Sequence, residues 1–162
     1  MRLGHIQQVG APGQVYADPA NLFVADFMGF KNIWDASVGT LRENGDSLEA
    51  ELTMKGMKLT ARLRYRPGDP RREALVAAFK AGTAVKTAIR PEDIRVGRNE
   101  TGIPLRSRVT LMEYQGQTSY VSALMENDTT VELRPSMQVR VGETLELSIA
   151  PEKVFVFAAD RG

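Results

Sequence analysis

Alternating apolar and polar positions lead into and out of the same tight turn at two places in the chain. Residues 88–96 read Ala-Ile-Arg-Pro-Glu-Asp-Ile-Arg-Val, and residues 148–156 read Ser-Ile-Ala-Pro-Glu-Lys-Val-Phe-Val. Alternation with a period of two is typical of a strand with one buried face, and the Pro-Glu pair favours a turn. We therefore predict two copies of one small β unit, each with two strands around a Pro-Glu turn.

The similarity between the copies extends upstream, with a different spacing. Val-Gly-Thr-Leu at 38–41, followed by Gly45, corresponds to Val-Thr-Leu-Met at 109–112, followed by Gly116, 71 positions later. The two Pro-Glu turns lie only 60 positions apart. The first copy therefore carries about eleven additional residues between its first strands and its turn.

Those additional residues have the signals of a short helix. Asp69 is a suitable N-cap, Pro70 suits the first helical position, and Gly82 suits the end of the helix. Three apolar side chains, Leu75, Val76 and Phe79, form one stripe. The pattern predicts a helix inserted into the first copy.

The N-terminal region is expected to hold one strand and two helical segments. Residues 2–9 are predicted as a strand, and Pro12 begins a short helical turn. Asp18 is the predicted cap of a second helix over 20–28, which Gly29 ends. This helix is apolar around nearly its whole circumference, so we expect another element or another chain to cover it.

Several of these segments resemble a known family. Gly-His-Ile-Gln-Gln-Val-Gly-Ala-Pro-Gly-Gln-Val-Tyr at 4–16 and Asp-Pro-Ala-Asn-Leu-Phe-Val-Ala-Asp-Phe-Met-Gly at 18–29 closely resemble the last segment of the ATPase domain in bacterial ABC importers. Arg-Pro-Glu-Asp-Ile at 90–94, the repeated β units and Val-Phe-Val-Phe at 154–157 resemble the domain that follows there. This is the transport-associated OB (TOBE) domain of spermidine/putrescine-, iron- and sugar-type importers. The predicted helix at 69–81 departs from the usual pattern.

The resemblance implies an all-β fold. We expect OB-fold-like barrels built from two repeated β units, with a short N-terminal strand and helices. Residues 1–31 would correspond to the C-terminal segment of an ABC ATPase domain, and 32–162 to a TOBE/OB-like regulatory domain with an internal repeat at approximately 36–97 and 107–158. The chain thus resembles an ABC ATPase cut just before the end of its ATPase domain.

The resemblance also implies an accessory role in an ATP-driven import system. In the family the domain contributes to dimerisation and in some members senses substrate or a regulatory protein. The implied partners are the ATPase domain of the same protein, the permease subunits of the transporter and a second copy of the chain. The implied place is the cytoplasmic side of the inner membrane, peripheral to it through the transporter complex.

Composition and motifs argue against catalysis by the chain itself. The sequence has no Gly-x-x-x-x-Gly-Lys-Ser/Thr phosphate loop, no Ser-Gly-Gly-Gln signature and no apolar strand that ends in an Asp-Glu pair. It has no cysteine and one histidine, His5. We therefore expect no catalytic residue, metal or cofactor in this chain; ATP and Mg²⁺ belong to the full-length family. No apolar run approaches the roughly 18 residues of a membrane span, so we predict a cytoplasmic protein without membrane insertion.

Two sets of residues are candidates for contacts. If a ligand binds, we expect it in the cleft between the two β units, and the candidate residues for a ligand or domain contact are Arg90, Glu92, Ser136 and Arg140. Arg90 is favoured because the second copy has Ala150 at that position. The apolar N-terminal segment is the candidate for self-association into a homodimer, through Phe23, Phe27, Met28 and Phe30.

The alternative is a stand-alone OB-type binding module for a small ligand or single-stranded nucleic acid. OB barrels bind single strands with a basic groove and stacking aromatics. The densest basic run of the chain surrounds Tyr65 and consists of Arg62, Arg64, Arg66, Arg71 and Arg72. Because the first three alternate on one strand face and the net charge is only +1, a solvated face is favoured and no nucleic-acid partner is expected.

Overall fold

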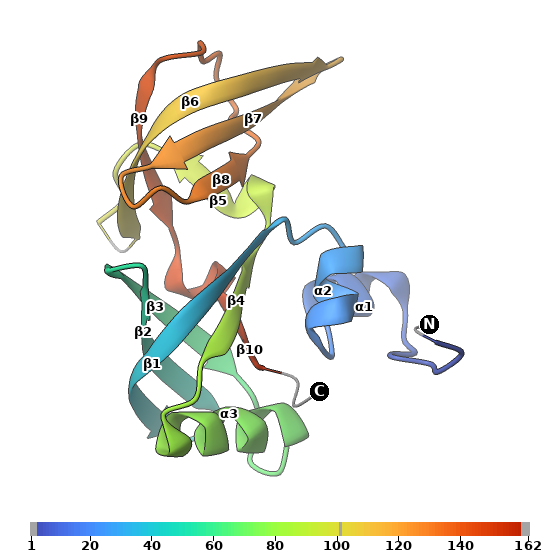
Figure 1. The fold of residues 1–162 in the computed structure, drawn as a ribbon. Helices are drawn as coiled ribbons and strands as arrows, with labels where there is room; N and C mark the ends of the chain where they lie inside the picture. Colours follow the sequence, from blue (N-terminus) through green and yellow to red (C-terminus); the bar gives the residue numbers. More distant parts are fainter. Residues whose placement is uncertain (1–2, 101, 160–162) are drawn as a thin grey trace.

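The computed structural model describes residues 3–100 and 102–159, which form two five-stranded antiparallel sheets stacked end to end (Figure 1). The first sheet has the order β10-β4-β1-β2-β3, and the second has the order β5-β9-β6-β7-β8. The strands of the first sheet are β1 (Asn32–Asn44), β2 (Ser47–Met54), β3 (Met57–Arg64), β4 (Val85–Ile89) and β10 (Phe155–Ala158). Those of the second are β5 (Ile94–Val96), β6 (Ile103–Gln115), β7 (Thr118–Met125), β8 (Thr130–Leu133) and β9 (Thr144–Ile149). The all-β, OB-like fold is confirmed.

The two sheets, called here the first and second β units, exchange one strand each. β5 follows the first unit in sequence but pairs with β9 of the second, with Ile94 opposite Ile149. β10 follows the second unit but pairs with β4 of the first, with Val156 opposite Thr87. The prediction placed both strands around each Pro-Glu turn in one unit, and the pairings show that each turn is a crossing between units.

Both crossings are single turns of 3₁₀-helix. The first, η1, spans Pro91–Asp93, and the second, η2, spans Pro151–Lys153. A proline stands at the first position of each, where its missing N–H leaves no hydrogen bond unmade. This explains why the same Pro-Glu sequence recurs at both crossings.

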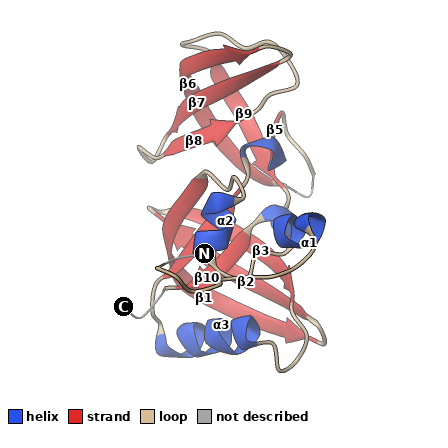
Figure 2. Ribbon diagram, turned by 90° about the vertical axis from the view of Figure 1, so that its right-hand side faces the viewer, coloured by secondary structure: helices blue, strands red, loops and turns tan. Residues whose placement is uncertain are grey.

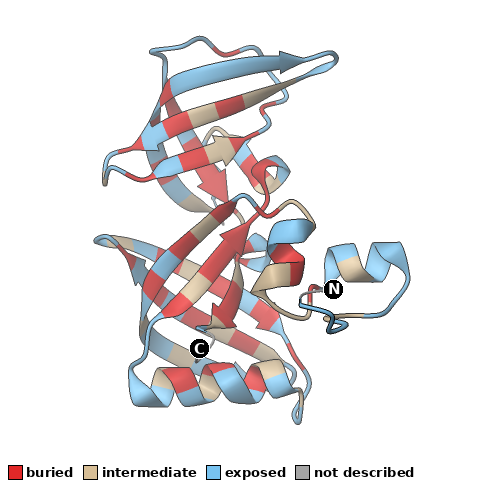
Figure 3. Ribbon diagram, turned by 45° about the vertical axis from the view of Figure 1, so that its right-hand side comes forward, coloured by how far each residue is buried: buried red, intermediate tan, exposed pale blue. Residues whose placement is uncertain are grey.

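The long hairpins of the two units match in detail. β1 and β2 lose register between Val38 and Leu41, and β6 and β7 lose it between Val109 and Leu111, so both units have a bulge at the corresponding place. The hairpin turns hold Gly45 and Gly116, both in the left-handed region, with φ of 56° and 73°. The upstream part of the predicted repeat is thus a structural repeat, and buried residues alternate with less buried ones along β2 and along the second half of β7 (Figure 3).

The predicted inserted helix is α3 (Pro70–Ala81), which lies across one end of the first unit (Figure 1). The Asp69 side chain caps its N-terminus, and Gly82, in the left-handed conformation, ends it. The buried positions are Arg72, Leu75 and Ala78. The buried face therefore differs from the predicted apolar stripe. It includes Arg72 as well as Leu75, whereas Val76 is only half-buried.

The N-terminal region contains two short helices, α1 (Pro12–Ala17) and α2 (Leu22–Phe27), beside the first unit (Figure 2). The strand predicted over 2–9 is absent from its described residues, 3–9, which hold only an isolated bridge at His5. The predicted cap of the second helix was also wrong. Asn21 caps α2 by accepting a hydrogen bond from the Val24 amide, because Asp18 is engaged elsewhere, as described below.

One apolar core runs through both units, and a smaller one lies beneath α2. The large cluster includes residues from both sheets and from α3, so the two units are packed together. The smaller cluster joins Ala25 and Phe30 to Ala88 of β4 and Phe157 of β10. The apolar helix predicted to need a cover is therefore partly covered by the first unit itself. No helix within 3–100 and 102–159 is long and apolar enough to cross a membrane.

Candidate functional site

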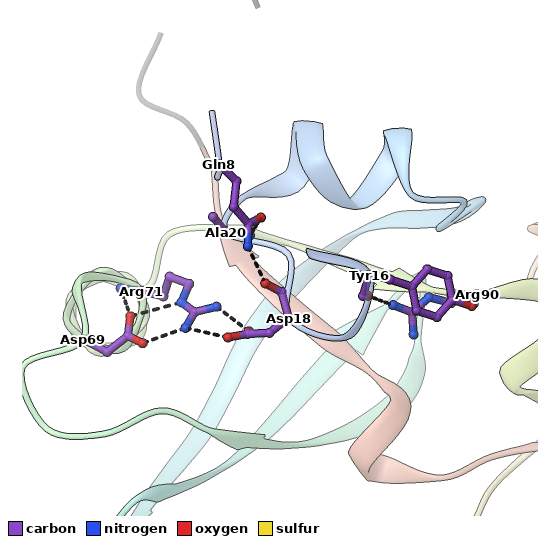
Figure 4. Close-up of polar contacts among 7 residues, drawn as sticks. All are labelled: Gln8, Tyr16, Asp18, Ala20, Asp69, Arg71 and Arg90. Atoms are coloured by element: carbon purple, nitrogen blue, oxygen red, sulfur yellow. Dashed lines mark hydrogen bonds and ion pairs between the residues drawn. The ribbon is translucent and has the colours of Figure 1, made fainter. Parts of the chain in front are cut away.

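The candidate site is the joint where the N-terminal segment, residues 3–30, is fixed to the β units. Two arginines from different elements make its principal polar contacts, Arg90 after β4 and Arg71 in the first turn of α3 (Figure 4). Each contacts an aromatic ring and a carboxylate. They are described in turn as the Arg90 clamp and the Arg71 clamp.

The Arg90 clamp is buried. Arg90 is only 5% exposed, and its guanidinium carbon lies 3.9 Å from the centre of the Tyr16 ring and 4.0 Å from that of Phe30. It also donates a hydrogen bond to the backbone carbonyl of Tyr16. A guanidinium between aromatic faces gains cation–π attraction that grows when water is excluded. Arg90 therefore fixes α1 to the start of η1.

Carboxylates of η1 complete this clamp. Asp93 Oδ2 lies 3.6 Å from Arg90 Nη1, and Asp93 Oδ1 lies 3.3 Å from Lys153 Nζ on η2. The Tyr16 hydroxyl donates a 2.6 Å hydrogen bond to Glu92 Oε1, and this bond raises the pKa of Tyr16. The clamp thus connects the N-terminal segment to both crossings between the β units.

The Arg71 clamp lies nearer to solvent. Arg71 Nη2 lies 2.7 Å from Asp69 Oδ2 and 3.2 Å from Asp18 Oδ2, so one guanidinium bridges α3 and the N-terminal segment. Its carbon lies 4.4 Å from the centre of the Tyr65 ring. Hydrogen bonds from Arg71 lower the pKa of Asp69, and burial raises the pKa of Tyr65 to about 12.

Two glutamine side chains form hydrogen bonds within the N-terminal segment. The Gln8 side chain donates to the Asp18 carbonyl at 3.0 Å and accepts from the Ala20 amide at 2.8 Å (Figure 4). Gln7 accepts from the Asn21 side chain at 3.1 Å. Residues 7–21 therefore form a closed loop that the two clamps hold against the β units.

The side chains of the joint attach the N-terminal segment to the β units. Its groups are guanidinium, carboxylate, phenol and amide, and most of them contact one another, although the Tyr65 hydroxyl and Arg90 Nε are buried without a hydrogen-bond partner among the described residues. The described residues contain no group of three or more His, Asp or Glu placed to hold a metal ion. The arrangement attaches the N-terminal segment to the first crossing between the β units and, through Asp93 and Lys153, connects it to the second.

The four residues expected at a ligand or domain contact fall in two places. Arg90 and Glu92 lie in the joint, whereas Ser136 and Arg140 are exposed in the connection from β8 to β9. Arg140 lines a hollow on the second unit whose lining includes neither Arg90 nor Glu92, so this hollow does not join the two pairs. A ligand or domain contact at these four residues stays a prediction.

The residues expected to drive self-association also separate. Phe30 is fully buried inside the chain, so its expected exposure was wrong: β4, β10 and Arg90 cover it. Phe27 is 82% exposed. Phe23, Phe27 and Met28 line a hollow of about 200 Å³ together with residues of the preceding segment.

The basic run around Tyr65 is largely neutralised. Arg62 pairs with Glu152 and Glu49, and Arg72 is buried with its Nη2 2.8 Å from Glu43 Oε2. With Arg71 held by two aspartates, three of the five arginines have carboxylate partners. These ion pairs use much of the positive charge of the run, and the absence of a nucleic-acid partner stays a prediction.

Sequence reasoning missed Arg71, Asp18 and Tyr16 as contact residues. Arg71 follows Asp69 by two positions, which gave a local signal for a paired arginine. Its contact with Asp18, 53 residues away, and that of Tyr16 with Glu92, 76 residues away, depend on how α1 docks. No periodicity in the sequence encodes that docking.

Comparison with known proteins gives three findings. Residues 87–157 match the TOBE domain family. The chain is 34% identical over 162 residues to the sn-glycerol-3-phosphate import ATP-binding protein of Chromobacterium violaceum, covering 97% of this chain and 38% of that protein. It is 32% identical over 146 residues to the spermidine/putrescine import ATP-binding protein of Photobacterium profundum, covering 88% of this chain and 33% of that protein.

The chain thus spans 38% and 33% of the lengths of these two relatives. Among solved structures, the cytoplasmic molybdate-binding protein ModG, with molybdate bound, has a similar fold. The TM-score is 0.65 at 15% sequence identity, over 79% of this chain and 96% of ModG. At this identity the likeness concerns the fold alone.

Proposed function

This chain belongs to the TOBE-containing C-terminal regions of ABC importer ATP-binding proteins, and from that premise we propose that it couples an ATPase domain to a regulatory β module. The observation that carries the proposal is the Arg90 clamp. The segment that resembles the end of an ATPase domain is fixed by a buried cation to the turn between the two β units. A rotation of that segment would therefore move both units together.

The names of the relatives favour a role that does not depend on the transported substrate. One relative is named for an organophosphate and another for polyamines, which carry opposite charges, yet this one chain is similar to both over most of its length. We accordingly assign to the chain the steps common to such importers. These are attachment to the ATPase domain and dimerisation, on the cytoplasmic side of the membrane beside the permease subunits. Sensing of substrate or a regulatory protein is proposed in addition, as a step that differs between importers.

A chimera tests this proposal. Residues 4–162 would replace the aligned C-terminal region of the Photobacterium profundum protein, and spermidine uptake would be measured in cells that lack the native subunit. We expect uptake well above that of the truncated protein without a C-terminal region. The control is the same chimera with Arg90→Ala, which should be expressed equally and show reduced uptake. Uptake no better than that of the truncated protein, at equal expression, would contradict the proposal.

The stand-alone binding module is tested on the isolated chain. Isothermal titration with spermidine, molybdate and a single-stranded oligonucleotide at low salt would detect it. Binding of any of these, together with a chimera that is expressed but inactive, would replace the coupling role with the binding role.

A further inference from the structure

The tips of the two long hairpins have the same backbone plan and differ in one residue type. The β1–β2 ladder ends at Asn44 and the β6–β7 ladder ends at Gln115, and in each case a two-residue turn follows. Each turn begins with a glycine at positive φ, Gly45 or Gly116. The residue before this glycine is thus an asparagine in the first unit and a glutamine in the second.

An Asn-Gly pair has a reactivity that a Gln-Gly pair largely lacks. The backbone nitrogen of the residue after an asparagine can attack the side-chain carbonyl carbon and close a five-membered ring. Glycine hinders this attack least, because it has no Cβ and its backbone turns most freely. The same attack on a glutamine must close a six-membered ring and is much slower. The repeat therefore places a reactive pair and a nearly inert pair in the same kind of turn.

The surroundings of Asn44 leave its side chain free to react. Asn44 and Gly45 are both exposed, and a Cβ added to Gly45 would meet no atom of the described residues within 4 Å. Within residues 3–100 and 102–159, neither the Asn44 side chain nor the Gly45 N–H makes a hydrogen bond. Asn44 is also the last residue of β1, so a rotation that brings the Gly45 nitrogen to the side chain disturbs only the end of the ladder.

Three other asparagines are held in place. The side chains of Asn21, Asn32 and Asn127 each make at least two hydrogen bonds with other residues. Asn32 is in addition only 1% exposed. The residues that follow these three are leucine, isoleucine and aspartate, whose side chains hinder the attack. Asn44 therefore differs from them in both its freedom and its neighbour.

We propose that Asn44 is a site of spontaneous deamidation in the folded protein, with water as the co-reactant. The Gly45 nitrogen gives up its proton and forms a bond to Asn44 Cγ, while the Cγ–Nδ2 bond breaks and ammonia leaves with that proton. Water then opens the ring, its hydroxyl adding to one of the two carbonyl carbons and its proton going to the nitrogen. Opening at Cγ gives aspartate. Opening at the backbone carbon gives isoaspartate, in which the main chain runs through the side-chain carbons.

The isoaspartate product loosens α3. Arg72 donates at 2.8 Å to the Gly45 carbonyl and lies 2.8 Å from the Glu43 carboxylate, so it holds the first turn of α3 against the hairpin tip. An additional main-chain carbon before Gly45 moves that carbonyl away from Arg72. Arg71, the preceding residue, bridges to Asp18, so the change reaches the Arg71 clamp. The inference does not depend on the proposed coupling role.

The test incubates the folded chain at mildly alkaline pH until a free peptide of residues 40–48 is largely deamidated. Mass spectrometry of proteolytic fragments then measures the deamidation of each asparagine and separates aspartate from isoaspartate. We expect Asn44 to react about ten times as fast as Asn127, and Gln115 to stay unmodified. Asn44→Gln, which gives the first tip the residue of the second, should abolish the modification there. An unmodified Asn44 in the folded chain, or one that reacts no faster than Asn127, would overturn the proposal.

The effect on α3 is measured on the aged chain. Hydrogen exchange in the first turn of α3 should rise several-fold in the fraction that carries isoaspartate. The matched control is freshly prepared Asn44→Asp, which adds the same charge without changing the main chain and should exchange as the wild type does. Equal exchange in the isoaspartate fraction and this variant would overturn the inferred effect on α3.

Discussion

The Tyr16 hydroxyl donates a 2.6 Å hydrogen bond to Glu92 Oε1, although 76 residues separate the two in sequence. The ring of the same tyrosine lies 3.9 Å from the Arg90 guanidinium carbon. One side chain of α1 thus contacts two residues at the crossing between the β units. The attachment of the N-terminal segment can be tested at each of these contacts separately.

Tyr16→Phe keeps the aromatic ring over Arg90 and removes only the hydrogen bond to Glu92. We expect this variant to weaken the docking of α1 by about 1 kcal/mol, the usual net value of one hydrogen bond. Tyr16→Ala should weaken it more, because the cation–π contact is lost as well. Hydrogen exchange of the α1 and α2 amides measures both. Equal exchange in the two variants would show that the ring contributes nothing.

Arg90→Ala gives the first copy the residue that the second copy has at Ala150. It leaves Asp93, whose side chain is 12% exposed, with Lys153 as its remaining ionic partner in the joint, so we expect the free energy of unfolding to fall by about 3 kcal/mol. Urea denaturation measures this. The control is Arg98→Ala, which removes an exposed pair with Glu146 and should leave the free energy of unfolding nearly unchanged.

Acid should loosen the Arg71 clamp. Hydrogen bonds from Arg71 lower the pKa of Asp69 in the folded chain, so the contribution of this carboxylate is present above its ordinary pKa and is lost as the pH falls through the folded value. We expect the free energy of unfolding to fall less steeply below about pH 4 in Asp69→Asn than in the wild type. Parallel curves for the two proteins would remove Asp69 as a cause of acid sensitivity.

Tyr65 should give the opposite pH dependence. Burial raises its pKa to about 12 from an ordinary value of 10.0, so its contribution is present below pH 10 and is lost as the pH rises towards 12. A shift of two units corresponds to roughly 3 kcal/mol. In Tyr65→Phe we expect this part of the alkaline loss of stability to disappear, measured by urea denaturation between pH 9 and 12. An unchanged alkaline curve would place the titrating group elsewhere.

The strand exchange is tested by truncating one core residue of each exchanged strand. Val156→Ala removes two methyl groups from a site that is 1% exposed and should cost about 2 kcal/mol. Although Val156 follows the second unit in sequence, we expect hydrogen exchange to rise most in β4 of the first unit. The reciprocal variant, Ile94→Ala, should act on β9. Effects confined to the sequence neighbours of each residue would contradict the pairings.

Local signals predicted much of the fold. Alternation of apolar residues predicted the long hairpins, and Asp69, Pro70 and Gly82 predicted α3 nearly to the residue, because caps act within one turn of helix. The strand predicted over 2–9 failed for the opposite reason. Polar side chains of this segment form hydrogen bonds with the backbone of residues farther along the chain, as Gln8 does with Asp18 and Ala20.

Only some residues of the joint could be predicted from the sequence. Arg90 could be found from the comparison of the two copies, because its replacement by Ala150 breaks the repeat. Its aromatic neighbours could not, since Tyr16 and Phe30 reach it through the docking of α1 and α2 on β4 and β10. The exchange of β5 and β10 was likewise hidden, because alternation reports which face of a strand is buried and not which sheet it joins.

The exchange of strands reverses the order in which the two units can be completed during synthesis. When the ribosome has added Ile149, every strand of the second unit exists, since β5 was made long before. The first unit, although translated earlier, still waits for residues 155–158 to pair with β4. Loss of residues 155–158 would therefore damage the first unit, although the other strands of that unit lie between residues 32 and 89.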